Sequence, residues 1–195
     1  MAARKKERIR AFVALDLEPM SLRRVVRVSD RLRMGSGAPS AAWTPSKNLH
    51  VTLQFAGDLA VDAIEPLGKA LAPLAEGKPA PAPSALRLSA FPSAEKARVV
   101  VVELVDASGA VAKLAEKVAK ITAKHGVVAE DREFRPHVTI ARLRLAYDAR
   151  RWLRLELAEV AGECRAASMT LYESQPGDEE PTYVPRGRWA FAAPE

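Results

Sequence analysis

The chain of 195 residues has a single cysteine, Cys164, and no long apolar run. One thiol forms no disulfide within the chain, and it supplies neither a multi-cysteine zinc site nor an iron–sulfur cluster. The apolar stretch behind the basic N-terminus, residues 11–15, ends at Asp16 and is too short for a signal peptide. The longest apolar run elsewhere, 99–102, is far below the roughly 20 residues of a membrane helix. We therefore expect a cytoplasmic protein that contacts no membrane.

The composition is that of a globular protein with a basic surface. Hydrophobic residues make up 48% of the chain, and 30 Lys and Arg outnumber 24 Asp and Glu, which gives a net charge of +6. A positive net charge attracts polyanions, but it does not indicate which polyanion binds. The length suits one domain spanning 1–195, in which residues 1–8 precede the first predicted strand. The oligomeric state leaves no mark on the sequence, and we expect a monomer.

Hydrophobic patterning predicts an alternation of strands and helices. Strands are predicted at 9–17, 50–55, 85–91, 98–105, 137–143, 166–173 and 183–191. Helices are predicted at 19–35, at 62–75, between an N-cap at Ser108 and a stop at Gly126, and at 148–156. The segments 36–47, 77–83, 130–136 and 174–182 are predicted to be loops.

The predicted elements form an approximate repeat of two strand–helix–strand units. The second strand of each unit begins with the same kind of tetrad, HVTL at His50 and HVTI at His137. Side chains alternate between the faces of a strand, so His50 shares a face with Thr52, and His137 with Thr139. Two copies indicate two similar lobes rather than a solenoid. We expect their polar faces to meet in one central cleft.

Paired histidines and threonines suit acid–base chemistry at phosphorus. One histidine can activate water while the other protonates the leaving oxygen. Threonine hydroxyls can stabilise the oxygens on which charge builds up. A zinc site is the weaker interpretation, because no HExxH motif, carboxylate cluster or cysteine cluster accompanies the histidines. The third histidine, His125, lacks the tetrad and precedes a helix stop, so we give it no catalytic role.

The two tetrads resemble the paired H-x-T-x signatures of the 2H phosphoesterase superfamily. The likeness is greatest to the RNA 2′,3′-cyclic phosphodiesterases, also called 2′-5′ RNA ligases, and it extends over nearly the whole chain. The matching segments are FVALDL, NLHVTLQFAGDL, SAFPSAEKARVVVVEL, FRPHVTIARLR, LYES and PTYVPRGRWAF. The resemblance implies an α+β fold of two pseudo-symmetric lobes, each an antiparallel-rich sheet backed by helices, with a central cleft.

The resemblance also implies roles for particular residues. His50 corresponds to the proton donor and His137 to the proton acceptor, while Thr52 and Thr139 contact the phosphate. Arg142 matches a basic residue that binds phosphate in some members.

Further residues are assigned less directly. Arg135 is the runner-up for the basic role of Arg142, and for either arginine a solvated surface charge is the alternative. Phe12 and Tyr172 are candidates for base stacking or for core packing. Residues 1–8 are interpreted as a solvated tail, with an RNA-binding arm as the alternative.

We therefore predict an enzyme that hydrolyses RNA 2′,3′-cyclic phosphate ends to 2′-phosphate ends without a metal or organic cofactor. One alternative is a 2H enzyme acting on a small cyclic phosphate such as ADP-ribose cyclic phosphate. Another is a non-catalytic RNA-binding module, although both tetrads are intact. Weak 2′-5′ RNA ligation is a third, as the reverse of the same reaction.

Overall fold

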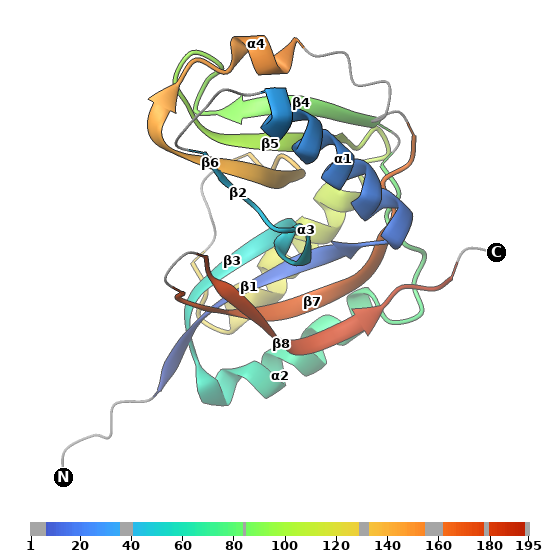
Figure 1. Cartoon of the computed structure of the whole chain (residues 1–195). Coiled ribbons are helices and arrows are strands. Elements are labelled where there is room, and N and C mark those ends of the chain that lie inside the picture. Colours follow the sequence, from blue (N-terminus) through green and yellow to red (C-terminus); the bar gives the residue numbers. More distant parts are fainter. Residues whose placement is uncertain are drawn as a thin grey trace.

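The computed structural model describes residues 7–35, 41–83, 85–128, 133–154, 162–177 and 180–193. Within these ranges the chain forms eight strands and four α-helices (Figure 1). The strands are β1 (Arg8–Leu17), β2 (Ala41–Trp43), β3 (Val51–Ala60), β4 (Ala85–Phe91), β5 (Ala97–Val105), β6 (His137–Tyr147), β7 (Ala166–Gln175) and β8 (Thr182–Ala190). The helices are α1 (Pro19–Gly35), α2 (Ile64–Leu71), α3 (Ala110–Lys124) and α4 (Arg150–Leu153), and three 3-10 turns, η1 (Ser46–Asn48), η2 (Val61–Ala63) and η3 (Ala72–Leu74), lie between them.

The strands pair in the order β4-β5-β6-β3-β1-β7-β8, and β2 adds to β6. All the pairings are antiparallel. One residue pair, Val51 with Val138, joins β3 to β6. This narrow connection divides the sheet into two halves, one of β1, β3, β7 and β8 and the other of β2, β4, β5 and β6. The predicted α+β fold with two antiparallel-rich lobes is confirmed.

Each long helix packs on the half-sheet of the other repeat unit. Helix α1 follows β1 but contacts β6, and α3 follows β5 but contacts β3. Figure 1 shows α1 beside β4, β5 and β6, with α2 and α3 beside the half that carries β1 and β3. This exchange couples the two halves. If either half-sheet unfolded, the apolar face of the helix that packs on it, which belongs to the other repeat unit, would be exposed.

The helices form because apolar residues recur at helical spacing. Val25, Val28 and Leu32 of α1 are fully buried. Full burial of such a side chain stabilises the fold by roughly 1.5–3 kcal/mol. In α3 the same role falls to Val111 and Val118, which are also fully buried. Packing of these stripes fixes the helices behind the strands.

The ends of α3 show one correct and one incorrect prediction. Gly126 stops the helix as expected: its φ is +83°, its N–H donates to Ala123, and the next N–H donates to Thr122. Ser108 is not the N-cap. That position belongs to Gly109, with a φ of +67°. The Asp106 carboxylate accepts the first helical N–H groups at 2.8–3.2 Å, and the Ser108 hydroxyl shares that of Ala110 at 3.2 Å, because the left-handed glycine turns the chain back towards them.

Other boundaries also differ from the predictions. The predicted loop 36–47 contains β2 and part of η1. Strand β2 forms because β6 extends beyond its single contact with β3 and leaves an edge to be paired. The predicted helix 62–75 is split into η2, α2 and η3, and the helix predicted at 148–156 is only α4 among the described residues. Strands β3 and β6 run further than predicted, to Ala60 and Tyr147.

Candidate functional site

The two tetrads meet where the half-sheets join. Val51 and Val138 pair directly, and both are fully buried. The opposite face, here called the motif face, carries half-buried His50, Thr52, His137 and Thr139. Antiparallel pairing at the valines sets His50 beside Thr139 and His137 beside Thr52. The four residues that the sequence singled out therefore come together around a pseudo-twofold point.

Both histidines are oriented in the same way. Nδ1 of His50 donates to the carbonyl of Asn48 at 2.8 Å, and Nδ1 of His137 donates to that of Arg135 at 2.6 Å. A carbonyl only accepts, so these bonds fix the tautomer and leave Nε2 of each neutral ring as the basic nitrogen. Nε2 of His50 lies 3.1 Å from Oγ1 of Thr52. Each ring thus presents the nitrogen that can exchange a proton with substrate.

His50 sits in an aromatic box. Phe12 stacks on its ring with centroids 4.9 Å apart, and Tyr183 meets it edge-on at 5.3 Å. Tyr172 lies 6.4 Å away. Burial lowers the pKa of His50 to about 4, against the opposing effects of the Asn48 carbonyl and Asp16. The charges of Arg142 and His137 lower this pKa further, so the free protein holds His50 neutral at neutral pH.

A β-bulge brings Arg142 onto the motif face. Val101 pairs with Thr139 but Val100 pairs with Ala141, so Ile140 is an extra residue in β6. After the bulge, the alternation of side chains between the two faces of β6 is shifted by one residue. Arg142, five residues after His137, therefore shares the face of the histidine instead of the opposite one. Burial raises the pKa of Tyr183, and the charge of Arg142 opposes that rise, while the same charge adds to the lowering of the His50 pKa by burial.

The other predicted candidates have mainly structural contacts. Arg135 forms an ion pair with buried Glu103 and lies over the Phe91 ring at 5.2 Å. Phe12 is buried beneath His50, and the hydroxyl of Tyr172 donates to Asp16 at 2.7 Å. His125 ends α3, outside the motif strands.

Three residues of the site escaped sequence reasoning. Tyr183 flanks His50, Asn48 orients it and donates its amide to the carbonyl of Pro181 at 3.1 Å, and Asp16 acts on it electrostatically. Tyr183 lies more than 130 residues from His50 in the sequence, so no local pattern links them. A signal for Asp16 was present: it precedes Glu103 by 87 residues, the same interval that separates the histidines.

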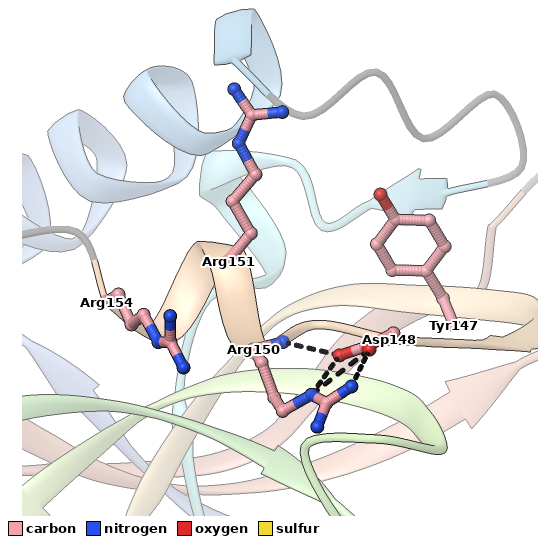
Figure 2. A pocket seen from close by; sticks show the side chains of 5 residues that line it. All are labelled: Tyr147, Asp148, Arg150, Arg151 and Arg154. Carbon is pink, nitrogen blue, oxygen red and sulfur yellow. Dashed lines mark hydrogen bonds and ion pairs between the residues drawn. The ribbon is translucent and has the colours of Figure 1, made fainter.

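A large hollow lies elsewhere on the protein. It has a volume of about 700 Å³ and is lined by Tyr147, Asp148, Arg150, Arg151 and Arg154. Figure 2 shows Arg150 turned onto Asp148, while Arg151 extends away from this pair. The Arg150 guanidinium lowers the pKa of Asp148 to about 2. None of the tetrad residues lines this hollow, so it is separate from the candidate site.

Two further properties bear on the site. Among the described residues, no group of three or more His, Cys, Asp or Glu side chains could hold a metal ion. No helix in the described part of the chain is both long and apolar enough to cross a bilayer.

Two half-sheets joined at paired His-x-Thr strands define a 2H phosphoesterase. The sequence model of the 2′-5′ RNA ligase superfamily matches residues 21–178, which include both tetrads. The chain belongs to this superfamily.

Related proteins support the assignment. The RNA 2′,3′-cyclic phosphodiesterase of Aquifex aeolicus is 32% identical over 111 residues, 54% of this chain and 56% of that protein. The protein of the same name from Aeropyrum pernix is 29% identical over 155 residues, 77% of this chain and 85% of its own. Escherichia coli LigT complexed with 3′-AMP has a TM-score of 0.75 at 22% identity, covering 96% of this chain and 100% of LigT. A Thermus thermophilus protein, TT0787, has a TM-score of 0.72 at 21% identity, covering 94% of this chain and 98% of its own. The solved structures share the fold.

Proposed function

We propose that this protein hydrolyses RNA 2′,3′-cyclic phosphate ends to 2′-phosphate ends by two-histidine acid–base catalysis. The observation that carries the proposal is the pairing of Val51 with Val138, which brings the two tetrads together on one face. Both the Aquifex and the Aeropyrum relatives are named RNA 2′,3′-cyclic phosphodiesterases. The net charge of +6 favours a polyanionic substrate.

His137 acts as the base and His50 as the acid in this reaction. Nε2 of His137 takes a proton from water, and the water oxygen bonds to phosphorus. The bond from phosphorus to the 3′ oxygen breaks, and that oxygen receives the proton of His50. The products are a 2′-phosphate and a 3′-hydroxyl. Proton exchange with solvent then restores both rings.

Because His50 is neutral in the free protein, the bound substrate must raise its pKa before it can donate a proton. A donor must carry a proton, yet burial holds the pKa of His50 near 4. An anionic phosphate beside the ring favours the imidazolium and raises this pKa. The acid is therefore generated on binding, which limits the charged form to the complex.

Hydroxyls and a guanidinium stabilise the phosphorane-like transition state. Thr52 and Thr139 flank the point where the tetrads meet, and their hydroxyls donate to the non-bridging oxygens. Arg142 adds a positive charge on the same face, where charge on phosphate oxygens increases. No step requires a metal ion.

Product analysis tests the proposal. The protein is incubated in EDTA with an RNA oligonucleotide that ends in a 2′,3′-cyclic phosphate, and the isomer of the product is identified. We expect 2′-phosphate, with His137→Ala as the inactive control. A 3′-phosphate product would refute the direction of ring opening. Faster turnover of ADP-ribose cyclic phosphate than of the oligonucleotide would favour a small substrate, and binding without turnover would indicate a non-catalytic RNA-binding module. Joining of RNA ends in the same mixture would reveal 2′-5′ ligation.

A further inference from the structure

Each motif histidine faces a carboxylate on the neighbouring strand. Glu103 of β5 pairs directly with His137 of β6. In the other half, Leu15 pairs with Val51, so the next antiparallel position sets Asp16 of β1 beside His50. The interval from Asp16 to Glu103 is 87 residues, as it is from His50 to His137. The two carboxylates are thus equivalent positions of the repeat.

Glu103 is neutralised by two arginines. Its side chain is only 6% exposed. Oε2 accepts from Nε and Nη2 of Arg87 at 3.1 and 2.7 Å, and Oε1 pairs with the guanidinium of Arg135. Such charge-assisted contacts occupy both oxygens. Little negative charge remains to act on His137.

Asp16 is held mainly by neutral groups. Oδ2 accepts from the hydroxyls of Ser168 and Thr170 at 2.8 and 2.7 Å, and Oδ1 accepts from Tyr172 at 2.7 Å. The cation that pairs with it is Arg188, whose Nε lies 3.4 Å from Oδ2 and whose side chain is 57% exposed. Three hydroxyls fix the carboxylate without cancelling its charge. The arginines on the two carboxylates are similarly exposed, so the contrast lies in their contacts: one arginine at 3.4 Å on Asp16, against two arginines on Glu103, of which Arg87 donates at 2.7 and 3.1 Å.

The charges facing His50 come from few groups. Among the described residues, Asp16 on β1 raises the pKa of His50 electrostatically, and Arg142 and His137 on β6 lower it. The phenols of Tyr172 on β7 and Tyr183 on β8 also face the ring, but burial raises the pKa of both, so they stay neutral at neutral pH. Asp16 is therefore the carboxylate among these groups that favours a proton on His50.

We propose that Asp16 is a positioning residue that makes His50, rather than His137, the proton donor once phosphate is bound. The inference rests on the proposed function. Repeat symmetry places a carboxylate beside each histidine. The charge of the one beside His137 is balanced by two arginines, whereas the charge of the one beside His50 is not. The asymmetry of the acid and the base thus originates in the ion-pair partners of Asp16 and Glu103.

An NMR titration of the His50 imidazole tests this without depending on turnover. The titration is performed with saturating inorganic phosphate on the wild type and on Asp16→Asn, which keeps the size of the side chain. Loss of an adjacent opposite charge lowers the pKa of the protonated group by about one unit or more. Ser168→Ala is the matched control, because it removes a hydrogen bond to Asp16 but no charge. Asp58→Asn removes the same charge at the far end of β3, and both controls should titrate as the wild type does.

Two further variants keep the test decisive. Arg188→Gln removes the cation next to Asp16 and should move the His50 titration to higher pH, in the opposite direction to Asp16→Asn. This result is available even if Asp16→Asn fails to fold. Asp16→Glu retains the charge and should restore most of the shift. An unchanged His50 titration in both Asp16→Asn and Arg188→Gln would overturn the role of Asp16.

Kinetics separate this inference from the proposed function. Wild-type turnover of a cyclic-phosphate oligonucleotide is measured first, and its absence would remove the proposed function. Given turnover, the alkaline limb of the kcat profile should move to lower pH by about one unit in Asp16→Asn, with about a tenfold loss at neutral pH. A titration that shifts while the kcat profile does not would overturn the assignment of His50 as donor.

Discussion

Burial of His50 makes the stability of this protein depend on pH between about 6.5 and 4. The folded chain lowers the pKa of His50 from 6.5 to about 4, chiefly through desolvation. Below pH 6.5 the unfolded chain therefore binds a proton that the folded chain excludes. The contribution of neutral His50 to stability is complete above pH 6.5 and is lost as the pH falls towards 4.

The magnitude follows from the size of the shift. One pKa unit corresponds to about 1.36 kcal/mol, so the full shift sets an upper bound of roughly 3 kcal/mol. The imidazole is half-buried. Solvent screening reduces the effect to roughly 1–2 kcal/mol. At a typical urea m-value of about 2 kcal/mol/M, the unfolding midpoint falls by about 0.5–1 M between pH 6.5 and 4.

Urea unfolding at pH 7 and pH 4.5 measures this loss in the wild type and in His50→Gln. Glutamine cannot take up the proton. The urea midpoint of His50→Gln should therefore fall less than that of the wild type between the two pH values, and the difference between the two falls should be most of the expected change of about 0.5–1 M. Saturating phosphate should also reduce the pH dependence of the wild type, because the anion favours protonated His50 in the folded state. An equal loss of stability in the wild type and His50→Gln would refute the reasoning.

Four predictions concern turnover. Activity should survive exhaustive EDTA treatment, and a loss that one divalent ion restores would contradict the metal-free mechanism. His50→Ala and His137→Ala should each lower kcat by about 10²–10⁴-fold with the fold intact by circular dichroism, and the double variant should be little worse than the worse single one. Thr52→Val and Thr139→Val should each lower kcat by no more than about 10²–10³-fold, because each removes one donor to the phosphate oxygens. Arg142→Gln removes a positive charge from the same oxygens and should lower kcat/KM, and steady-state kinetics measure all three effects. KM for an RNA oligomer should rise with salt more steeply than KM for a cyclic mononucleotide, because counterion release grows with the number of phosphate contacts, and equal slopes would argue against extended RNA contacts.

Local pattern was sufficient to predict most elements but not their partners. The stripe of Val25, Val28 and Leu32 predicts a helix with one apolar face, and α1 is that helix. Periodicity does not tell which sheet the face covers, and α1 covers the half-sheet of the other repeat. The same limit explains β2, whose three residues form a strand only because β6 offers an unpaired edge.

The bulges mark where strand alternation stops being a guide. Alternation holds from His50 to Thr52, but Leu53 is an extra residue in β3, just as Ile140 is in β6. Gln54 is consequently buried while Phe55 is 54% exposed. A bulge depends on the partner strand, so a single sequence does not reveal it. The family resemblance, and not the pattern, pointed to Arg142.

Repeat symmetry and its local breaking together explain how such a site can carry out acid–base chemistry. The 87-residue interval relates His50 to His137 and Thr52 to Thr139, and the same interval relates Phe55 to Arg142. Identical pairs supply two hydrogen-bonded imidazoles, whereas hydrolysis needs one ring with a proton and one without. A strictly symmetric site would give both histidines the same proton affinity. The non-identical pairs provide the difference. An aromatic ring in one half occupies the position equivalent to an arginine in the other, and, one strand further out, a carboxylate held mainly by hydroxyls occupies the position equivalent to one held by two arginines.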